Sequence, residues 1–309
     1  MIRAIIAGVL LATAVAGAAN GQQVPDTLFV PVTAPAAFGI GAGPRLVIDG
    51  GHHNFHTVNG RYAPFARLAA RDGYRVSGST SRFSDEMLSS VDVLVIANAL
   101  NAINDRNNWS LPTPSAFADD EIAAVRRFVE RGGALLMIAD HMPFAGATEA
   151  LGAALGVSFV NGFAYDAANN SIFTYTRAKG MLAHPVFEGR NARERIDSVV
   201  AFTGSAFWLP AGGAPLMTIP AGSRVRMPSV AWQFSDSTAS VSAMGMLQGA
   251  ALRVGKGRVA VSGEAAMFSA QRAGPQGRNA MGFNAPAALQ NAQYALNVLH
   301  WLSGFLPDK

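Results

Sequence analysis

Four of the six histidines in this 309-residue chain lie in two short segments. His52, His53 and His56 follow an apolar run at residues 45–49, and His141 follows a second apolar run at 134–139. Both runs have the character of buried strands, and ligands of open parallel sheets bind beyond the carboxyl ends of the strands. We therefore expect both segments at one functional edge. The candidate substrate-binding residues there are His52, Asn54, His56, Asn98 and Asn101.

These residue types fit two kinds of catalytic or metal-binding site. A third interpretation gives them a purely structural role. Neutral imidazoles and carboxylates are good ligands for zinc or a similar divalent ion. Alternatively, His141 or His53 acts as a general base near neutral pH, supported by a carboxylate. The third interpretation is that the same groups only hydrogen-bond and cap loops. The metal-ligand candidates are His53, His56, Asp140 and His141, although their spacing matches no strong metal motif; the candidate supporting carboxylates are Asp140, Asp49 and Glu264.

Glu264 is a separate candidate catalytic residue. It follows the apolar run 258–262 through Gly263, so it is expected at the end of another strand. If that strand joins the same sheet, the carboxylate can face the histidine segments. As a first-turn residue of a helix it would only favour the helix dipole. The pattern leaves both roles open.

Several chemistries are excluded by what the sequence lacks. The chain has no cysteine, which rules out thiolate nucleophiles, Fe–S clusters and cysteine-ligated zinc. It has no Gly-x-Ser-x-Gly elbow, and no Gly-x-Gly-x-x-Gly loop follows the first strand. The formal charge of +4 comes from scattered arginines, which argues against a nucleic-acid partner.

The first half of the chain alternates apolar strands with amphipathic helices. This pattern predicts an α/β domain with a parallel sheet and helices on both faces. In a 2-1-3-4 strand order, the first and fourth strands would lie about 10 Å apart. The expected strands are 45–49, 74–77, 93–97 and 134–139, and the expected helices are 62–71, 85–90, 119–131 and 145–155.

The second half is less regular and richer in β signals. Lys256 and Gly257 are expected to form the turn between its last two strands, and a helix at 286–302 closes the chain. We find no internal repeat and no clear linker, which favours one domain over residues 44–309, preceded by an extended arm at 22–43. The expected strands are 157–160, 171–176, 198–203, 215–219, 230–234, 249–254 and 258–262.

The first 21 residues are typical of a cleaved signal peptide. Arg3 precedes an apolar run, and small residues near Ala16 and Ala18 offer a cleavage site. The run is shorter than the roughly 20 residues that a membrane-spanning helix needs. We expect a periplasmic or secreted protein with no membrane span after cleavage; the alternative is a retained N-terminal anchor.

Three segments resemble the class I glutamine amidotransferase-like superfamily. Residues 132–141 resemble its strand and nucleophile elbow, and Gly50-Gly51-His52-His53 is similar to its trehalose-utilisation-type branch. Residues 255–264 resemble a late strand of its exported and gliding-motility or intraflagellar-transport-like members. The resemblance implies a flavodoxin-like fold and an exposed elbow. Because Asp140 and His141 stand where an amidotransferase has its cysteine, it excludes glutamine hydrolysis through a thioester.

Together these features predict an exported protein with a polar His/Asp pocket. The leading hypothesis is a hydrolase-like or lytic activity on a small polar or carbohydrate-type ligand, with a histidine as base and a carboxylate in support. The alternative is a non-catalytic module of the same fold that binds a glycan or a cell-envelope partner.

Overall fold

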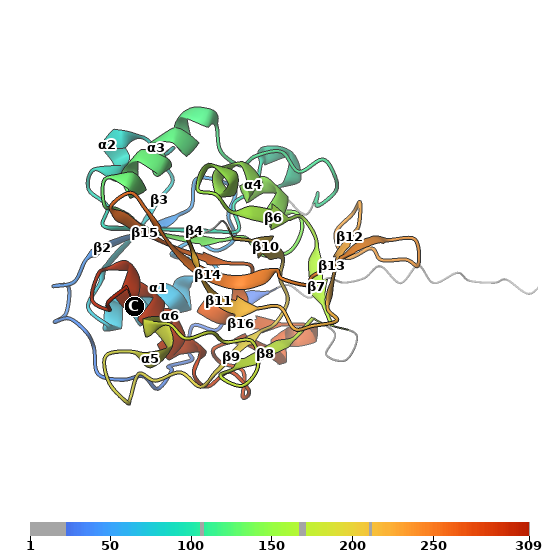
Figure 1. Cartoon of the computed structure of the whole chain (residues 1–309). Helices are drawn as coiled ribbons and strands as arrows, with labels where there is room; N and C mark the ends of the chain where they lie inside the picture. The colour runs from blue at the N-terminus through green and yellow to red at the C-terminus, as the bar shows by residue number, and fades with distance from the viewer. Residues whose placement is uncertain (1–22, 106–107, 167–170, 210–211, 309) are drawn as a thin grey trace, which may run out of the picture.

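The computed structural model describes residues 23–105, 108–166, 171–209 and 212–308. In this part of the chain, a nine-stranded mixed sheet forms the centre of the molecule (Figure 1). Five neighbouring strands are parallel, and the first four have the 2-1-3-4 order that the sequence analysis considered. In spatial order they are β3 (Arg75–Ser79), β2 (Arg45–Asp49), β4 (Val93–Ala97), β5 (Ala134–Ile138) and β15 (Gly257–Ser262).

The second half of the chain extends this sheet with antiparallel strands. β14 pairs with β15 across a tight turn at Gly255 and Lys256, one residue earlier than predicted. Gly255 has a φ of +58°, which glycine adopts without a steric penalty. The added strands are β14 (Leu247–Val254), β10 (Ala206–Trp208), β6 (Ser158–Val160) and β11 (Ala214–Thr218).

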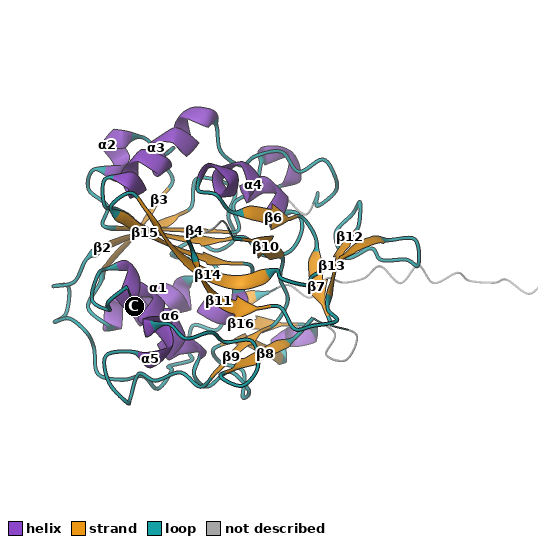
Figure 2. Cartoon of the chain, viewed as in Figure 1, coloured by secondary structure: helices purple, strands orange, loops and turns teal. Residues whose placement is uncertain are grey.

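Helices cover both faces of the sheet, as the apolar strands predicted (Figure 2). Successive residues of β2 point to opposite faces: Val47 packs in the cluster under α3 and α4, whereas Leu46 and Ile48 pack in the cluster under α1 and α6. The fold class is therefore the predicted one. The helices of one layer are α2 (Asp85–Leu88), α3 (Asp119–Glu130) and α4 (Phe144–Ala154); those of the other are α1 (Ala63–Arg71), α5 (Pro185–Glu188) and α6 (Asn291–Leu302).

Smaller sheets decorate the second half. Two of them involve segments that the sequence did not mark as strands, because three- or four-residue strands carry little periodicity. The arm contributes β1, and no helix or strand follows until β2. The three sheets are β1 (Val24–Pro25) with β16 (Ala270–Ala273) and β17 (Asn279–Gly282); β7 (Phe163–Tyr165) with β12 (Arg224–Met227) and β13 (Ala239–Ser242); and β8 (Phe173–Thr176) with β9 (Ser198–Ala201).

Two expected elements differ in the structure. The strand predicted at 230–234 is a loop, in which Val230 makes only an isolated bridge to Ser110. The last helix begins at Asn291, because the side chain of Asn291 and that of Gln290 hydrogen-bond to the backbone of the β9 segment instead. In both places, contacts with distant segments decide the backbone structure, and the local sequence pattern does not reveal such contacts.

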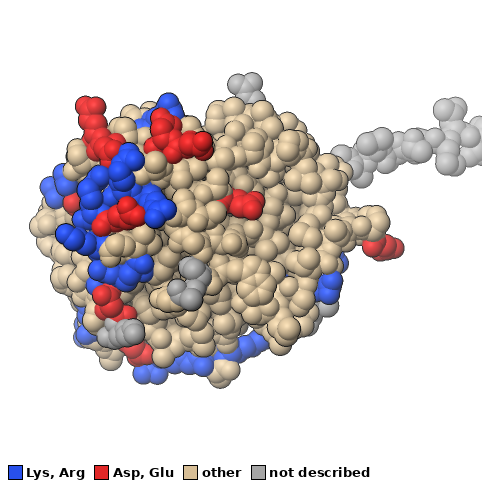
Figure 3. Space-filling model, turned by 45° about the horizontal axis from the view of Figure 1, so that its top comes forward, with Lys and Arg blue, Asp and Glu red and all other residues tan. Residues whose placement is uncertain are grey.

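Charged side chains gather at one end of the molecule, over α2 and α3 (Figure 3). Arg127 and Arg131 of α3 both pair with Asp85 at the start of α2. Among the described residues, no helix is long and apolar enough to cross a membrane. The expected signal peptide lies outside the described residues.

Candidate functional site

The parallel strands carry the predicted polar residues to one edge of the sheet. β5 ends at Ile138, which lies opposite Ala97 of β4 on one side and Ser262 of β15 on the other. Asp140 and Glu264 therefore emerge from neighbouring strands. The loop after β2 reaches the same edge.

His52 is fixed by a buried carboxylate network rather than directed at a ligand. Its Nδ1 lies 2.9 Å from Asp49, and its Nε2 lies 3.2 Å from Glu121 of α3. Phe83 and Phe117 flank the ring. Burial lowers the pKa of His52, but hydrogen bonds and charge from Asp49 and then Glu121 outweigh it and raise the pKa above its ordinary value. His52 thus holds the loop to α3.

This network predicts a pH dependence of stability. Because the folded-state pKa of His52 is raised, its contribution is fully present below the unfolded value near 6.5 and is lost as pH rises through the folded value. Urea denaturation of wild type and of His52→Gln gives the difference between their free energies of unfolding. This difference should be larger at pH 6 than at pH 9. A difference that grows with pH would contradict this assignment.

The predicted residues His53, Asn54 and Asn101 also have structural partners. His53 is partly exposed, has a φ of +50°, and pairs with Asp105 at 3.0 Å. Asn54 donates to Asp49 and to the Ala97 carbonyl, while Asn101 caps the short turn η1 (Ala102–Asn104). These residues shape the loops around the edge.

The predicted metal set is not assembled. His53 turns to Asp105 instead of joining His56, Asp140 and His141. Across the described ranges, no group of three or more His, Asp or Glu side chains is placed to hold a metal ion.

His141 is held as a neutral imidazole in one tautomer. Its Nδ1 lies 2.6 Å from the Met142 carbonyl, which can only accept a hydrogen bond, so Nδ1 carries the proton. Burial lowers the pKa of His141, although the charge of Asp140 opposes this. Within the described residues, no group hydrogen-bonds to Nε2. A neutral imidazole with a free Nε2 is the form that accepts a proton.

Aromatic rings surround His141. Phe163 of β7 stacks on it with centroids 4.5 Å apart and an interplanar angle of 11°, and Trp232 meets its edge at 4.6 Å. Trp232 is 43% exposed and has a φ of +68°, a conformation that is strained for a bulky residue. Phe234 is also partly exposed and packs on Phe163. The buried ring of His141, 7% exposed, therefore lies against a partly exposed tryptophan ring.

Asp140 and Glu264 form a buried carboxyl pair. Of the two roles considered for Glu264, the structure shows the cap: its carboxylate accepts the N–H groups of Ala266 and Met267 at the turn η2 (Ala266–Phe268). It also interacts with Asp140. Burial, followed by the charge of Asp140, raises the pKa of Glu264 well above its ordinary value; burial likewise raises the pKa of Asp140. Burial thus disfavours the charged form of both carboxyl groups.

Asp140 positions the elbow rather than the imidazole. Its Oδ1 accepts the backbone N–H of His141 at 2.7 Å, and its own N–H donates to Asn98 Oδ1. Asn98 adopts a left-handed conformation with a φ of +53°, as Asn tolerates. Asn98 and Asp140 thus fix the turn that presents His141.

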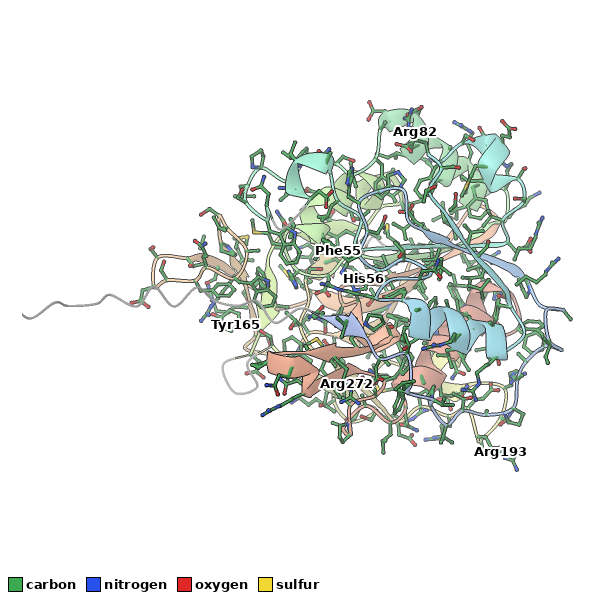
Figure 4. The ribbon with its side chains drawn as sticks, turned by 180° about the vertical axis from the view of Figure 1, so that it is seen from behind. Phe55, His56, Arg82, Tyr165, Arg193 and Arg272 are labelled. Carbon is green, nitrogen blue, oxygen red and sulfur yellow. The ribbon has the colours of Figure 1, made fainter. Side chains whose placement is uncertain are left out.

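His56 is a second buried imidazole of the site. It is 3% exposed, and its Nδ1 has no hydrogen-bond partner among the described residues. Its ring meets Tyr62 edge-on at 4.9 Å. Burial, followed by the charge of Arg61 and an electrostatic interaction with the His141 imidazole, holds the pKa of His56 well below its ordinary value. In Figure 4, His56 and Phe55 lie side by side within the molecule.

Two site residues were not predicted from the sequence. Arg61 is part-buried; its charge interacts with that of Asp140, and its Nε donates to the Gln23 carbonyl. Trp232 lies within the strand that the sequence pattern predicts at 230–234. The alternation of Trp232 and Phe234 could have marked an exposed aromatic pair, but nothing local places it against His141.

Comparisons with known proteins find similar folds only. No family model and no curated protein sequence matches the chain. The mmIFT52 N-terminal domain is similar with a TM-score of 0.55 and 13% identity, over 84% of this chain and 97% of that one. At this identity the likeness shows the fold alone.

Two further solved structures have lower TM-scores. A ThuA-like protein from Bacteroides uniformis ATCC 8492 has a TM-score of 0.47 and 12% identity, over 87% of this chain and 95% of that one. A GMP synthase subunit from Thermoplasma acidophilum has a TM-score of 0.44 and 10% identity, over 85% of this chain and 96% of that one.

Proposed function

We propose that this chain is an exported protein that binds a small polar or carbohydrate-type ligand at the carboxyl edge of its sheet and acts on it as a hydrolase-like or lytic enzyme. The observation that carries the proposal is His141: a neutral, tethered imidazole with a free Nε2 beside the exposed Trp232. Export rests on the first 21 residues, and mass spectrometry of the mature N-terminus tests it.

In this proposal His141 Nε2 accepts the proton of a water or ligand hydroxyl as that oxygen bonds to the ligand carbon that carries the leaving group, and the bond from this carbon to the leaving group breaks. The imidazolium so formed is stabilised by the charge of Asp140 and returns the proton to the leaving group. His56 is 3% exposed, so in this proposal it supports the site from within rather than contacting the ligand. These side chains all lie at the carboxyl edge of the central sheet.

The second candidate is a non-catalytic binding module for a glycan or envelope partner. It is favoured by the carboxylates, because Glu264 and Asp49 are already engaged by hydrogen-bond donors of the protein. Both candidate functions use the partly exposed Trp232 to bind the ligand, but only the enzyme converts the ligand to product. A panel of soluble gluco-, manno- and N-acetylglucosamine oligosaccharides, assayed for binding and for release of reducing ends, separates them.

Trp232→Ala should weaken binding of the responding oligosaccharide about tenfold or more, because a central tryptophan commonly contributes this much. Trp208→Ala is the matched control: it is 45% exposed, against 43% for Trp232, but lies in β10. Calorimetric titration measures both. Equal losses in the two variants, or none in either, would show that Trp232 is not the platform.

A further inference from the structure

A hollow lies away from the candidate site, between the N-terminal arm and helices α1 and α6. Its volume is about 900 Å³. It sits at the C-terminal end of α1, whereas His56 and Tyr62 precede the helix. In Figure 1 the blue arm passes along this side of the molecule. Its walls include arm residues 30–36, Leu68 and Arg71 of α1, and Gln293 and Leu296 of α6.

The hollow carries two arginines whose charge is not neutralised. Arg71, in the last turn of α1, and Arg193, in the loop after α5, both line it and are exposed. Neither side chain makes a hydrogen bond or ion pair with any described residue. Figure 4 shows Arg193 projecting outward at the lower edge. These guanidinium groups are therefore available to an anion.

Neighbouring charges are already engaged. Arg195 pairs with Asp197 at 3.1 Å. The carboxylate that lines the hollow, Asp72, is buried and is held by the Ala37 N–H and by His300. The free charge in the hollow is thus positive.

The walls also expose apolar side chains. Val32 is 92% exposed and Leu289 is 78% exposed, and both line the hollow. The arm is tied in place, because the Ala34 N–H donates to Gln293 Oε1 at 2.8 Å and Arg190 donates to the Pro35 carbonyl. The hollow is therefore preformed, with adjacent cationic and apolar parts.

We propose that this hollow binds a small amphipathic anion. Its carboxylate or phosphate head contacts Arg71 and Arg193, since guanidinium groups bind both anions through paired hydrogen bonds. Its short hydrocarbon part lies against Val32 and Leu289. This proposal is independent of the function proposed for the His141 site.

Calorimetric titration of the mature full chain with octanoate and with octyl phosphate tests it. At least one of these amphiphiles should bind, and the one that binds more tightly identifies the preferred head group, carboxylate or phosphate. Octanol, acetate and inorganic phosphate should each bind at least about tenfold more weakly, because each lacks one half of the ligand. Failure of both amphiphiles to bind, or equal binding of acetate or inorganic phosphate, would overturn the proposal.

Variants locate the binding. The double change Arg71→Gln with Arg193→Gln should weaken the better amphiphile about tenfold or more, whereas Arg67→Gln should not. Arg67 is the matched control, because it is exposed on α1 but does not line the hollow. Val32→Ser, at an exposed position, should weaken the amphiphile without lowering the unfolding temperature. Unchanged binding in the double variant would overturn the proposal.

Discussion

His141→Phe should reduce turnover of the responding oligosaccharide about 100- to 10,000-fold, the usual contribution of a general base. The substitution removes Nε2 but keeps an aromatic ring to stack on Phe163 and meet Trp232. Ligand binding should therefore change much less than turnover. Release of reducing ends measures turnover and calorimetric titration measures binding, both on the same protein preparation.

The control for this prediction is folding. The Met142 carbonyl loses its donor in His141→Phe, which costs about 1–3 kcal/mol of stability. The variant should nevertheless unfold cooperatively, with a far-UV spectrum like that of wild type. Full turnover in the folded variant would exclude His141 as the base, while binding without turnover in wild type would favour the non-catalytic module.

Asp49→Ala should lower the free energy of unfolding by about 3–5 kcal/mol, the range for removing one member of a buried charged pair. Asp49 is fully buried and accepts hydrogen bonds from the Gly51 N–H, His52 Nδ1 and Asn54 Nδ2. The substitution leaves these donors without their acceptor and the charge of His52 opposed only by Glu121. Urea denaturation near pH 7 measures the loss.

Asp120→Ala is the comparison variant, because Asp120 pairs with Arg82 on an exposed face of α3. Exposed ion pairs contribute about 0–1 kcal/mol. A loss for Asp49→Ala as small as that for Asp120→Ala would mean that the loop after β2 does not depend on this network.

The parallel half of the fold could be predicted from the sequence because its strands are buried on both faces. β4 and β5 are continuous apolar runs, and the helix that precedes β5 ends at two glycines. Such runs require cover on both sides, and a parallel order places their carboxyl ends together. This places Asp140 at the edge of the sheet, whereas the position of Glu264 depended on whether its strand joins the same sheet, which the pattern left open.

The orientation of the site residues could not be predicted in the same way. His52, His53 and His56 lie within five positions, yet one enters a carboxylate network, one reaches Asp105 and one is buried against Tyr62. Side-chain direction is periodic in strands and helices but not in loops. Trp232 likewise reaches His141 only through the packing of a loop 91 positions further along the chain.

The central claim is that His141 is a neutral base with Nδ1 protonated and Nε2 free for a ligand. Nitrogen NMR of the His141 ring, recorded from pH 5 to 8, tests it most directly. The account predicts a proton on Nδ1 alone at pH 6.5 and above, a pKa below the ordinary value of 6.5, and a shift of Nε2 when the responding oligosaccharide is added. A proton on Nε2 at pH 7, or an Nε2 signal indifferent to the ligand, would contradict it.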